Sequence, residues 1–390
     1  MKLKKWFCAV LSLMGVTVFA SDLDFSGYVR NYTGVFLSED PDFSILQNSF
    51  DLSMEYSASN VAFLANPYVN IDEEVVSDLD FRELYVDLFF TNFDFRVGKQ
   101  QVIWGKSDGV FITDVVSPKN LQEFLLPDFT EIRIGVNAAK IDYYIGSSTI
   151  EVIWVPEFVS NIMPESDSIW NTSGIDFSDS YDDIDTNLAN GEYFVRYSMM
   201  TSLCDFELVG AYMWDDEPVI TSFGPTMTFE HERLTMGGGS ASASLGNFVL
   251  RAEGAYYNGK DFYEDDYSLH TSDYVHYAVG LDTKIAGFSL SSQFIQKIIL
   301  DYEDSLQDDQ FTNTATFSIN KSFLRDTLTA KIFSYVEFGD TNALIRPSVS
   351  YDLGSGVVAI LGANIFLGDS GTYGQFDDND MGYVKVTYNF

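Results

Sequence analysis

Apolar and polar residues alternate with a period of two over many short stretches of this sequence. In SFDLSMEY (residues 49–56) every second residue is apolar, and the same pattern occurs in YVHYAVGLD (274–282) and FTNTATFSIN (311–320). A two-residue period is typical of β-strands that have one apolar and one polar face. Soluble β-sandwiches and membrane barrels share this pattern, so the alternation predicts an all-β chain without deciding whether the apolar face meets a core or lipid.

The connections between these stretches fall into two classes that take turns along the chain. Eight are tight turns, near residues 58, 92, 147, 203, 246, 286, 325 and 353. Nine are longer and mostly acidic: 38–44, 71–80, 102–131, 157–190, 215–224, 258–273, 301–310, 338–342 and 367–380. Short turns on one rim and long loops on the other are typical of outer-membrane barrels, with the short turns in the periplasm.

Eight turns and nine loops connect eighteen strands. We therefore predict a single transmembrane antiparallel β-barrel of 16 to 18 strands, each of about 9 to 11 residues, with both termini on the periplasmic side. Barrels of this size leave an aqueous channel, whereas barrels of about 8 strands are filled by side chains. The size itself indicates a pore.

The two ends of the chain support this location. Residues 1–20 have the form of a secretory signal peptide, with basic MKLKK, an apolar run and a small residue before Ser21. The barrel is then residues 21–390, and with Cys8 removed only Cys204 remains, which excludes an intramolecular disulfide. The final stretch GYVKVTYNF alternates and ends on Phe390. Such an end resembles the C-terminal signal read by the outer-membrane assembly machinery.

Charge and composition exclude several classes of function. The chain has 58 acidic and 22 basic residues, a net charge of −36 that argues against nucleic acid as a partner and enriches cations at the mouth. Three scattered histidines and acidic loops without calcium-loop spacing give no expectation of a metal site or cofactor. We find no serine, histidine and acid constellation, so the sequence predicts no enzyme.

Basic residues nevertheless gather in one region. Seven of the 22 lie between positions 82 and 140, around the stretch VGKQQVIWGKSDG (97–109). On the alternation, Glu83 and Asp87 on the fourth strand face the lumen, as do Arg96 and Gln100 on the fifth. The sixth strand is predicted around residues 132–137, with Arg133, Gly135 and Asn137 facing inward. Arg251, Glu253, Lys331 and Arg346 also have inward parity.

The loop 102–131 follows the fifth strand and is the third long loop. SPKNLQEFLLP (117–127) combines helix start and stop signals with apolar residues at helical spacing, which predicts a short amphipathic helix. The third loop of general porins folds into the barrel and narrows it. By position, we expect this loop to dock on the wall of strands four to six and to form the constriction with Glu83, Asp87, Arg96, Gln100, Trp104, Lys106, Asp108, Asp114 and Arg133.

Two roles for these charges are compatible with the sequence. Opposed charges at a narrow point filter solutes by charge and dipole. Alternatively, the basic residues neutralise neighbouring carboxylates and hold the loop in place. The two roles do not exclude each other.

A resemblance rests on the same region, roughly residues 93–165. The run from Phe95 to Val136, followed by DYYIG, IEVIWVPEF and SNIMP, resembles a family of bacterial outer-membrane proteins catalogued as a domain of unknown function, itself similar to alginate-export porins. The corresponding residues are Gly98, Gln100, Gln101, Trp104, Gly105, Asp108, Gly109, Asp114, Pro118, Leu121, Glu123, Phe124, Arg133, Pro156 and Phe158. The resemblance implies an outer-membrane channel and no enzymatic reaction.

We therefore expect a porin for passive diffusion of small hydrophilic solutes in the outer membrane of a diderm bacterium. Its partners are outer-membrane lipid, the assembly machinery and small solutes, and a homo-oligomer is compatible with the resemblance to porins. Two alternatives remain open: a structural or adhesive barrel that uses its acidic loops, and a substrate-specific export or uptake channel.

Overall fold

The computed structural model describes residues 23–390 except 39–40, 73–74, 77–78, 178–183, 223–226 and 340–341. The predicted signal peptide lies outside the described residues. Within them, no helix is both long and apolar enough to cross a membrane.

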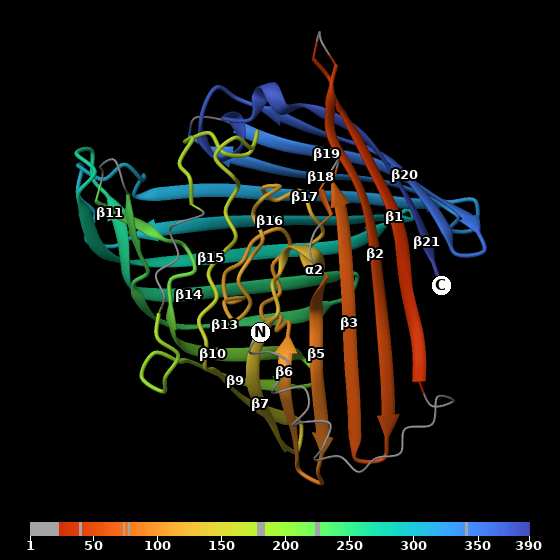
Figure 1. Cartoon of the computed structure of the whole chain (residues 1–390), viewed down its shortest axis with the longest axis horizontal. Coiled ribbons are helices and arrows are strands. Elements are labelled where there is room, and N and C mark those ends of the chain that lie inside the picture. The colour runs from red at the N-terminus through yellow and green to blue at the C-terminus, as the bar shows by residue number, and fades with distance from the viewer. Residues whose placement is uncertain are drawn as a thin grey trace.

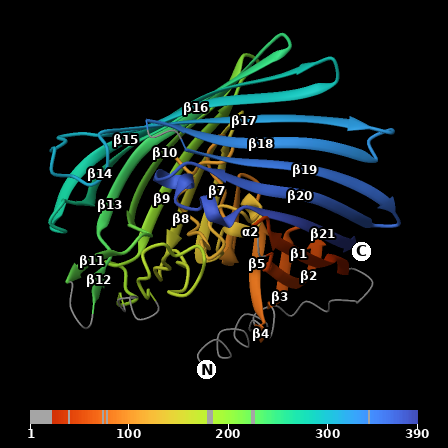
Figure 2. The same ribbon diagram turned by 90° about the horizontal axis from the view of Figure 1, so that it is seen from above.

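Eighteen antiparallel strands form one closed barrel (Figures 1 and 2). The first nine are β1 (Leu23–Phe36), β2 (Phe43–Ala58), β3 (Val61–Asp72), β5 (Asp80–Phe89), β6 (Phe93–Gln100), β7 (Val136–Ile145), β8 (Ser148–Val155), β9 (Glu192–Met200) and β10 (Cys204–Trp214). The other nine are β13 (Arg233–Leu245), β14 (Phe248–Tyr263), β15 (Leu269–Ile285), β16 (Phe288–Ile299), β17 (Phe311–Phe323), β18 (Leu328–Phe338), β19 (Asn342–Gly354), β20 (Val357–Leu367) and β21 (Met381–Asn389).

The remaining elements are short and lie in the long loops. They are the strands β4 (Val75–Val76), β11 (Val219–Ser222) and β12 (Thr228–Glu230), the helices α2 (Phe129–Ile132) and α3 (Gly371–Gly374), and the 3-10 helix η2 (Asp377–Asn379). β4 extends the β3 edge, and β11 pairs with β12 outside the barrel sheet.

The predicted count of eighteen strands and the alternation of tight turns with long loops are confirmed. Strand length differs from the expectation. β6 has 8 residues, whereas β15 has 17, more than a bilayer requires. The long strands β14 and β15 meet at residues 264–268 on the long-loop side of the barrel.

The first and last strands close the ring. β1 pairs with β21 from Tyr28 opposite Asn389 to Phe36 opposite Met381. Beyond this ladder, the backbones of Gly27 and Phe390 exchange two hydrogen bonds of 3.0 Å, and the Phe390 ring stacks on Phe50. The terminal aromatic residue therefore completes the seam between the two ends of the barrel.

The outer surface carries the apolar face of the strands. Large apolar side chains are exposed at every second position, among them Val97, Ile141, Val152, Leu208, Leu250, Val279, Leu281, Phe294, Phe317, Ile319, Val384 and Val386. A water-soluble protein would bury such a belt, whereas hydrocarbon accommodates it. The protein is an outer-membrane β-barrel, and the polar faces of its strands line the interior.

The predicted orientation of the sixth strand is wrong. β7 begins only at Val136, which is 1% exposed and faces the interior, while Asn137 is exposed. Residues 132–134 belong to the preceding loop, where Ile132 and Arg133 are buried. The stretch IRIGVN (132–137) spans the boundary between the preceding loop and β7, so its alternation does not belong to one strand. A shift of one residue moves every side chain of a strand to the opposite face of the sheet.

Residues Phe317 and Ser318 at the middle of β17 allow a test of the membrane face. Phe317 is exposed on the outer surface, and Ser318 points inward. Phe317→Arg should lower the free energy of unfolding by about 2 to 4 kcal/mol, because it places a charge in hydrocarbon. Ser318→Arg is the matched control and should have a much smaller effect. Denaturant titration from liposomes measures both, and equal losses would contradict the assigned faces.

Candidate pore constriction

The third long loop, residues 101–135 (loop L3), crosses the interior of the barrel. It leaves β6, reaches β14 and β16 on the far wall, returns past β19 and β1, and enters β7. Figure 1 shows its orange trace and α2 inside the ring of strands. Because these contacts lie on opposite walls, L3 spans the interior of the barrel.

The carboxylate of Glu253 on β14 is the main anchor of L3. Its Oε2 accepts hydrogen bonds from the backbone N–H groups of Lys106 (2.6 Å) and Ser107 (2.8 Å). Its Oε1 accepts from the backbone N–H (2.9 Å) and the hydroxyl (2.8 Å) of Thr113. Glu253 is 5% exposed, so its charge is stabilised by these donors in place of water. The turn between Lys106 and Thr113 is thereby fixed against the wall.

Neighbouring wall residues extend this anchor. On β16, the Gln293 side chain accepts from the Asp108 N–H (3.1 Å) and donates to the Asp108 carbonyl (2.7 Å). Arg251 on β14 pairs with the Asp108 carboxylate at 2.6 Å. On the near side, the Trp104 indole donates to Glu151 on β8 at 2.7 Å. The tip of L3 is therefore held by β8, β14 and β16.

The returning half of L3 binds the opposite wall. Arg346 on β19 donates to the carbonyls of Leu125 (3.2 Å) and Leu126 (2.6 Å). Arg30 on β1 pairs with Glu131 of α2 at 2.8 Å. Burial alone would raise the pKa of Glu131, but the adjacent Arg30 guanidinium lowers it overall. The expectation that L3 docks on strands four to six is therefore wrong, because most of its anchors lie on other strands.

The helix predicted at residues 117–127 does not form. Ser117, expected to cap it, instead exchanges hydrogen bonds with the backbone of Val102. The backbone of Pro118, Asn120 and Leu121 pairs with Ile134, Ile132 and Ile162 rather than within a helix. Tertiary partners thus outcompete the local helical signals, and the short helix of L3 is α2 at Phe129–Ile132.

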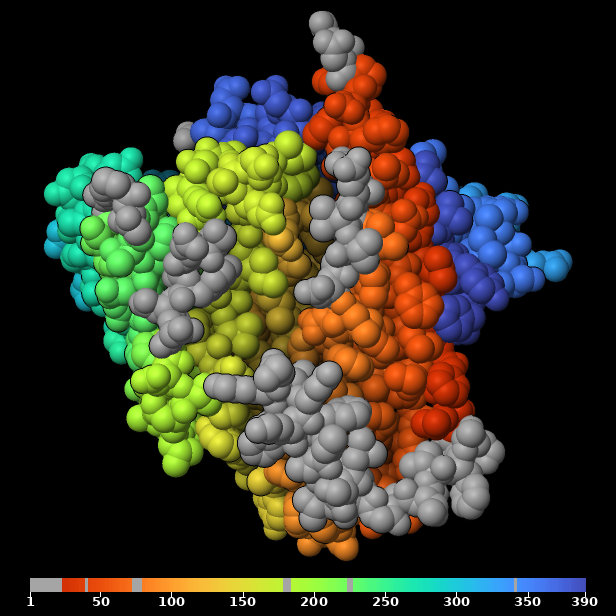
Figure 3. Space-filling view, viewed as in Figure 1, coloured from red at the N-terminus to blue at the C-terminus, as the bar shows by residue number. Residues whose placement is uncertain are grey.

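The apolar residues Leu121, Phe124 and Leu125 of that predicted helix are nevertheless partly buried. Phe124 packs in an aromatic cluster, with Phe376 at 4.8 Å, Tyr373 at 6.1 Å and Trp170 at 6.5 Å between ring centroids. Trp170 belongs to the fourth long loop, residues 156–191 (loop L4). In the space-filling view, yellow-green atoms of L4 lie between the orange and the green parts of the molecule (Figure 3). L3 and L4 therefore occupy the interior together.

The predicted site residues separate into two groups. Gln100, Trp104, Asp114 and Arg133 are buried. Trp104 binds Glu151 on the wall and Asp114 pairs with Arg133 inside L3, whereas Gln100 donates to the Ala138 carbonyl on β7. Burial raises the pKa of Asp114 despite the opposing pull of Arg133 and Lys119. Glu83 accepts a hydrogen bond from the Gln101 backbone (3.0 Å) at the start of L3. The contacts of Glu83, Trp104, Asp114 and Arg133 thus shape L3.

Solvent reaches the side chains of Arg96, Lys106 and Asp108, which are 24%, 19% and 54% exposed. Glu83 is also only partly buried. Arg96 forms a bidentate pair with Asp87 (2.7 and 2.8 Å) and lies over the Tyr85 ring. Lys106 is 4.0 Å from Glu207 on β10.

The cations of this wall are largely compensated by carboxylates. Further pairs are Arg82–Asp51, Lys140–Asp142, Lys140–Glu151, Arg196–Glu151 and Arg251–Asp282. The structure thus shows the neutralising role for these charges directly.

Sequence analysis missed Glu151 and Gln293 as anchors and did not give Glu253 this role. Glu253 was recognised only as inward-facing, and Glu151 sits in the otherwise apolar run IEVIWV. An acidic residue on the inward face of a strand indicates that a hydrogen-bond donor lies beside it in the interior. Its partner in L3 could not be predicted, because about 140 residues separate Glu253 from the amides that it binds.

A cavity of about 650 Å³ lies between L3, L4 and the wall of β14–β18. Its lining combines aromatic rings with three lysines, Lys119, Lys260 and Lys297, and with a group of acids at Asp215, Asp216 and Glu217. Lys119 is 3.5 Å from Asp216, and Lys260 is 2.6 Å from Asp215. The cavity is large enough for a small solute and has both charged and apolar surface.

Comparison with known proteins identifies a family and a fold. The family described as "Protein of unknown function (DUF1302)" matches residues 55–373. No curated protein matches the sequence.

Among solved structures, Pseudomonas aeruginosa OccK2 (OpdF) in complex with glucuronate has a TM-score of 0.60 at 10% identity, covering 95% of this chain and 97% of that one. P. aeruginosa OpdK with vanillate has a TM-score of 0.57 at 10% identity, covering 96% and 100%. Acinetobacter baumannii OccAB3 has a TM-score of 0.56 at 10% identity, covering 95% and 99%. At these identities the likeness establishes the fold.

Removing the charge of Glu253 should release L3. Glu253→Gln removes the negative charge that strengthens four hydrogen bonds to L3. A hydrogen bond to a charged group contributes roughly 1.5 to 3 kcal/mol to stability. Amide exchange at residues 106–113 should then accelerate about tenfold or more. Glu207→Gln is the matched control, since Glu207 is also an inward acid but meets L3 through the Lys106 side chain at 4.0 Å and not through its backbone. Similar acceleration in both variants would contradict the anchoring role.

Proposed function

This chain belongs to the DUF1302 family, and on that premise we propose that it is an outer-membrane channel for passive diffusion of small hydrophilic solutes, constricted by L3. The observation that carries the proposal is the path of L3, which crosses a closed barrel of eighteen strands and is anchored to opposite walls. A barrel of this size encloses an aqueous lumen, and an infolded loop sets its narrowest point.

The accessible charges at L3 give the channel its filter. Arg96, Lys106 and Asp108 reach solvent beside the loop, while Trp104, Asp114 and Arg133 keep the loop in place. Compensated pairs leave a local field rather than a large net charge, and such a field orders water and dipolar solutes. The proposed function needs no cofactor and no catalytic residue.

Substrate-specific uptake or export is the second candidate, and the cavity above L3 favours it. Aromatic rings line the cavity together with three lysines and neighbouring carboxylates, a combination that suits a small organic solute with a ring and polar groups. Two proteins of the same fold were solved with glucuronate and with vanillate, and both ligands carry a carboxylate. Saturable block of the ion current by such a carboxylate would favour this candidate, whereas a current unaffected by it would favour simple diffusion.

Excision of the L3 tip should widen the channel. A variant without residues 106–128 loses the segment that crosses the lumen, so its single-channel conductance in planar bilayers should exceed that of the parent. Heat-modifiable migration of both proteins serves as the control for folding. A silent parent with a conducting variant would make L3 a plug; two folded but silent proteins would overturn the channel proposal.

Asp216 should make charge selectivity depend on pH. Burial raises its pKa to about 6, opposed by Lys119 and reinforced by Asp215 and Glu217. The carboxylate is negative above that pH and neutral below it, so acidification from about pH 7.5 to about pH 5 should shift the reversal potential toward anions.

The Asp216→Asn variant should show a smaller shift over this range. Asp309→Asn, at an exposed position in the loop after β16, is the matched control and should behave like the parent. An unchanged pH response in Asp216→Asn would show that this carboxyl does not act on the permeating ion.

A further inference from the structure

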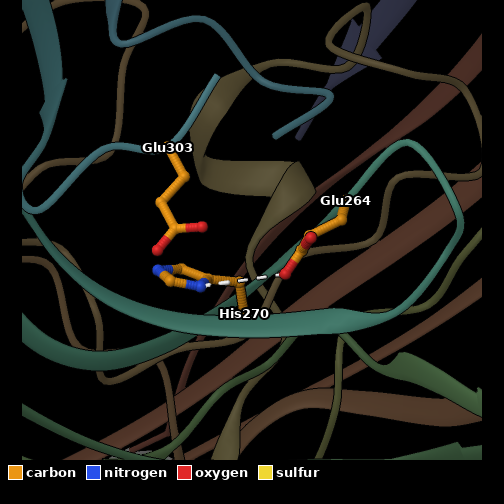
Figure 4. A group of neighbouring side chains, drawn as sticks. All are labelled: Glu264, His270 and Glu303. Atoms are coloured by element: carbon orange, nitrogen blue, oxygen red, sulfur yellow. Dashed lines mark ion pairs between the residues drawn. The ribbon is translucent and has the colours of Figure 1, made fainter. Parts of the chain in front are cut away.

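Three potential metal ligands converge on the long-loop rim, outside the constriction. Glu264 follows β14, His270 lies on β15, and Glu303 lies in the loop between β16 and β17. Their ligand atoms all lie within 4.8 Å of one another, and His270 Nδ1 is 3.9 Å from Glu264 Oε1. Figure 4 shows both carboxylates directed at the imidazole ring, one from the same hairpin and one from the neighbouring loop.

Backbone hydrogen bonds join the two loops that carry these ligands. Asp265 N–H donates to the Ser305 carbonyl (2.7 Å), and Gln307 N–H donates to the Tyr263 carbonyl (2.9 Å). The Gln307 side chain also donates to the carbonyl of Glu264 (2.8 Å). Glu264 and Leu306 form a β-bridge. The main chain on either side of the site is therefore already in place, which lowers the entropic cost of binding an ion.

A small apolar core packs beside the two loops that carry these ligands. Phe262, Ile299 and Leu306 are each 5% exposed or less and pack together, with Tyr274 and Tyr302 against them. Phe262 lies two residues before Glu264, and Leu306 lies three residues after Glu303. Both carboxylates are thus attached to backbone that the packing holds. Only the side chains need to adjust.

We propose that Glu264, His270 and Glu303 form a binding site for Zn²⁺. One imidazole nitrogen with two carboxylate oxygens is a donor set that suits zinc, whereas calcium and magnesium prefer oxygen ligands alone. Zinc bonds of about 2.0 to 2.1 Å place tetrahedral ligand atoms about 3.3 Å apart, so the side chains must close by roughly 1 to 1.5 Å. The exposed Glu303 side chain can supply that movement, and water completes the coordination.

A bound ion would connect two loops at the mouth of the barrel. Glu264 and His270 lie on the β14–β15 hairpin, and Glu303 lies on the loop that also carries Asp308. Asp308 is 3.7 Å from Lys297, which lines the cavity above L3. Zinc therefore stabilises the rim beside that cavity. The site does not depend on conduction, so binding can be tested whether or not the protein forms a pore.

Calorimetric titration of the folded, detergent-solubilised full barrel with Zn²⁺ tests the proposal. The parent should bind one ion at this site, and His270→Gln should weaken the affinity by at least about tenfold, since even indirect partners of a metal site contribute about 10- to 100-fold. Glu303→Gln should also weaken binding. Asp304→Asn, the matched control, removes the same charge from the adjacent position and should leave the affinity unchanged within about twofold.

Cobalt gives a readout that separates this site from general acidic binding. Co²⁺ at the proposed site should produce visible absorption that changes in His270→Gln, because the imidazole nitrogen leaves the coordination shell. The proposal is overturned if His270→Gln binds Zn²⁺ like the parent, if Asp304→Asn weakens binding as much as Glu303→Gln, or if the parent binds no Zn²⁺. In the first two outcomes, the acidic rim attracts cations without a defined site.

Discussion

Hydrocarbon provides no hydrogen-bonding partner for the peptide backbone, so each backbone group that crosses the membrane must be satisfied within the protein. This chain meets the constraint with a ladder that runs from β1 around to β21 and closes through the exchange between Gly27 and Phe390. Closure leaves no sheet edge in the membrane-facing wall. It also encloses a space whose walls are polar, and the placement of L3 depends on that space.

The interior carries many charges, and the structure stabilises them by pairing. Glu253, Glu151 and Gln293 are buried because L3 supplies the N–H groups that water would otherwise supply. The same contacts fix the loop, so the wall and the loop stabilise each other. Buried ionic contacts of this kind are costly to break, because removal of one partner leaves an uncompensated charge. A constriction built in this way has a defined shape.

The region rich in basic residues, 82–140, therefore has a mainly structural role at several positions. Asp114 and Arg133 pair inside the loop, and Trp104 and Gln100 bind wall groups away from solvent. Arg96, Lys106 and Asp108 remain accessible. The charge cluster in the sequence thus marked the region where L3 meets the wall, but it did not distinguish residues that hold the loop from residues that stay accessible, because both carry charge facing the lumen.

The sequence by itself determined the barrel: the two-residue period sets which face meets lipid, and the alternation of short turns with long loops sets the strand number. Both are local patterns. Tertiary structure decided the start of β7, the loss of the helix expected at residues 117–127, and the docking of L3 on β14, β16 and β19. It also brought His270 beside Glu303, far along the chain. These features depend on contacts between residues that are distant in the sequence and meet inside the closed barrel. The two-residue period of a strand carries no information about which residues face each other across the barrel.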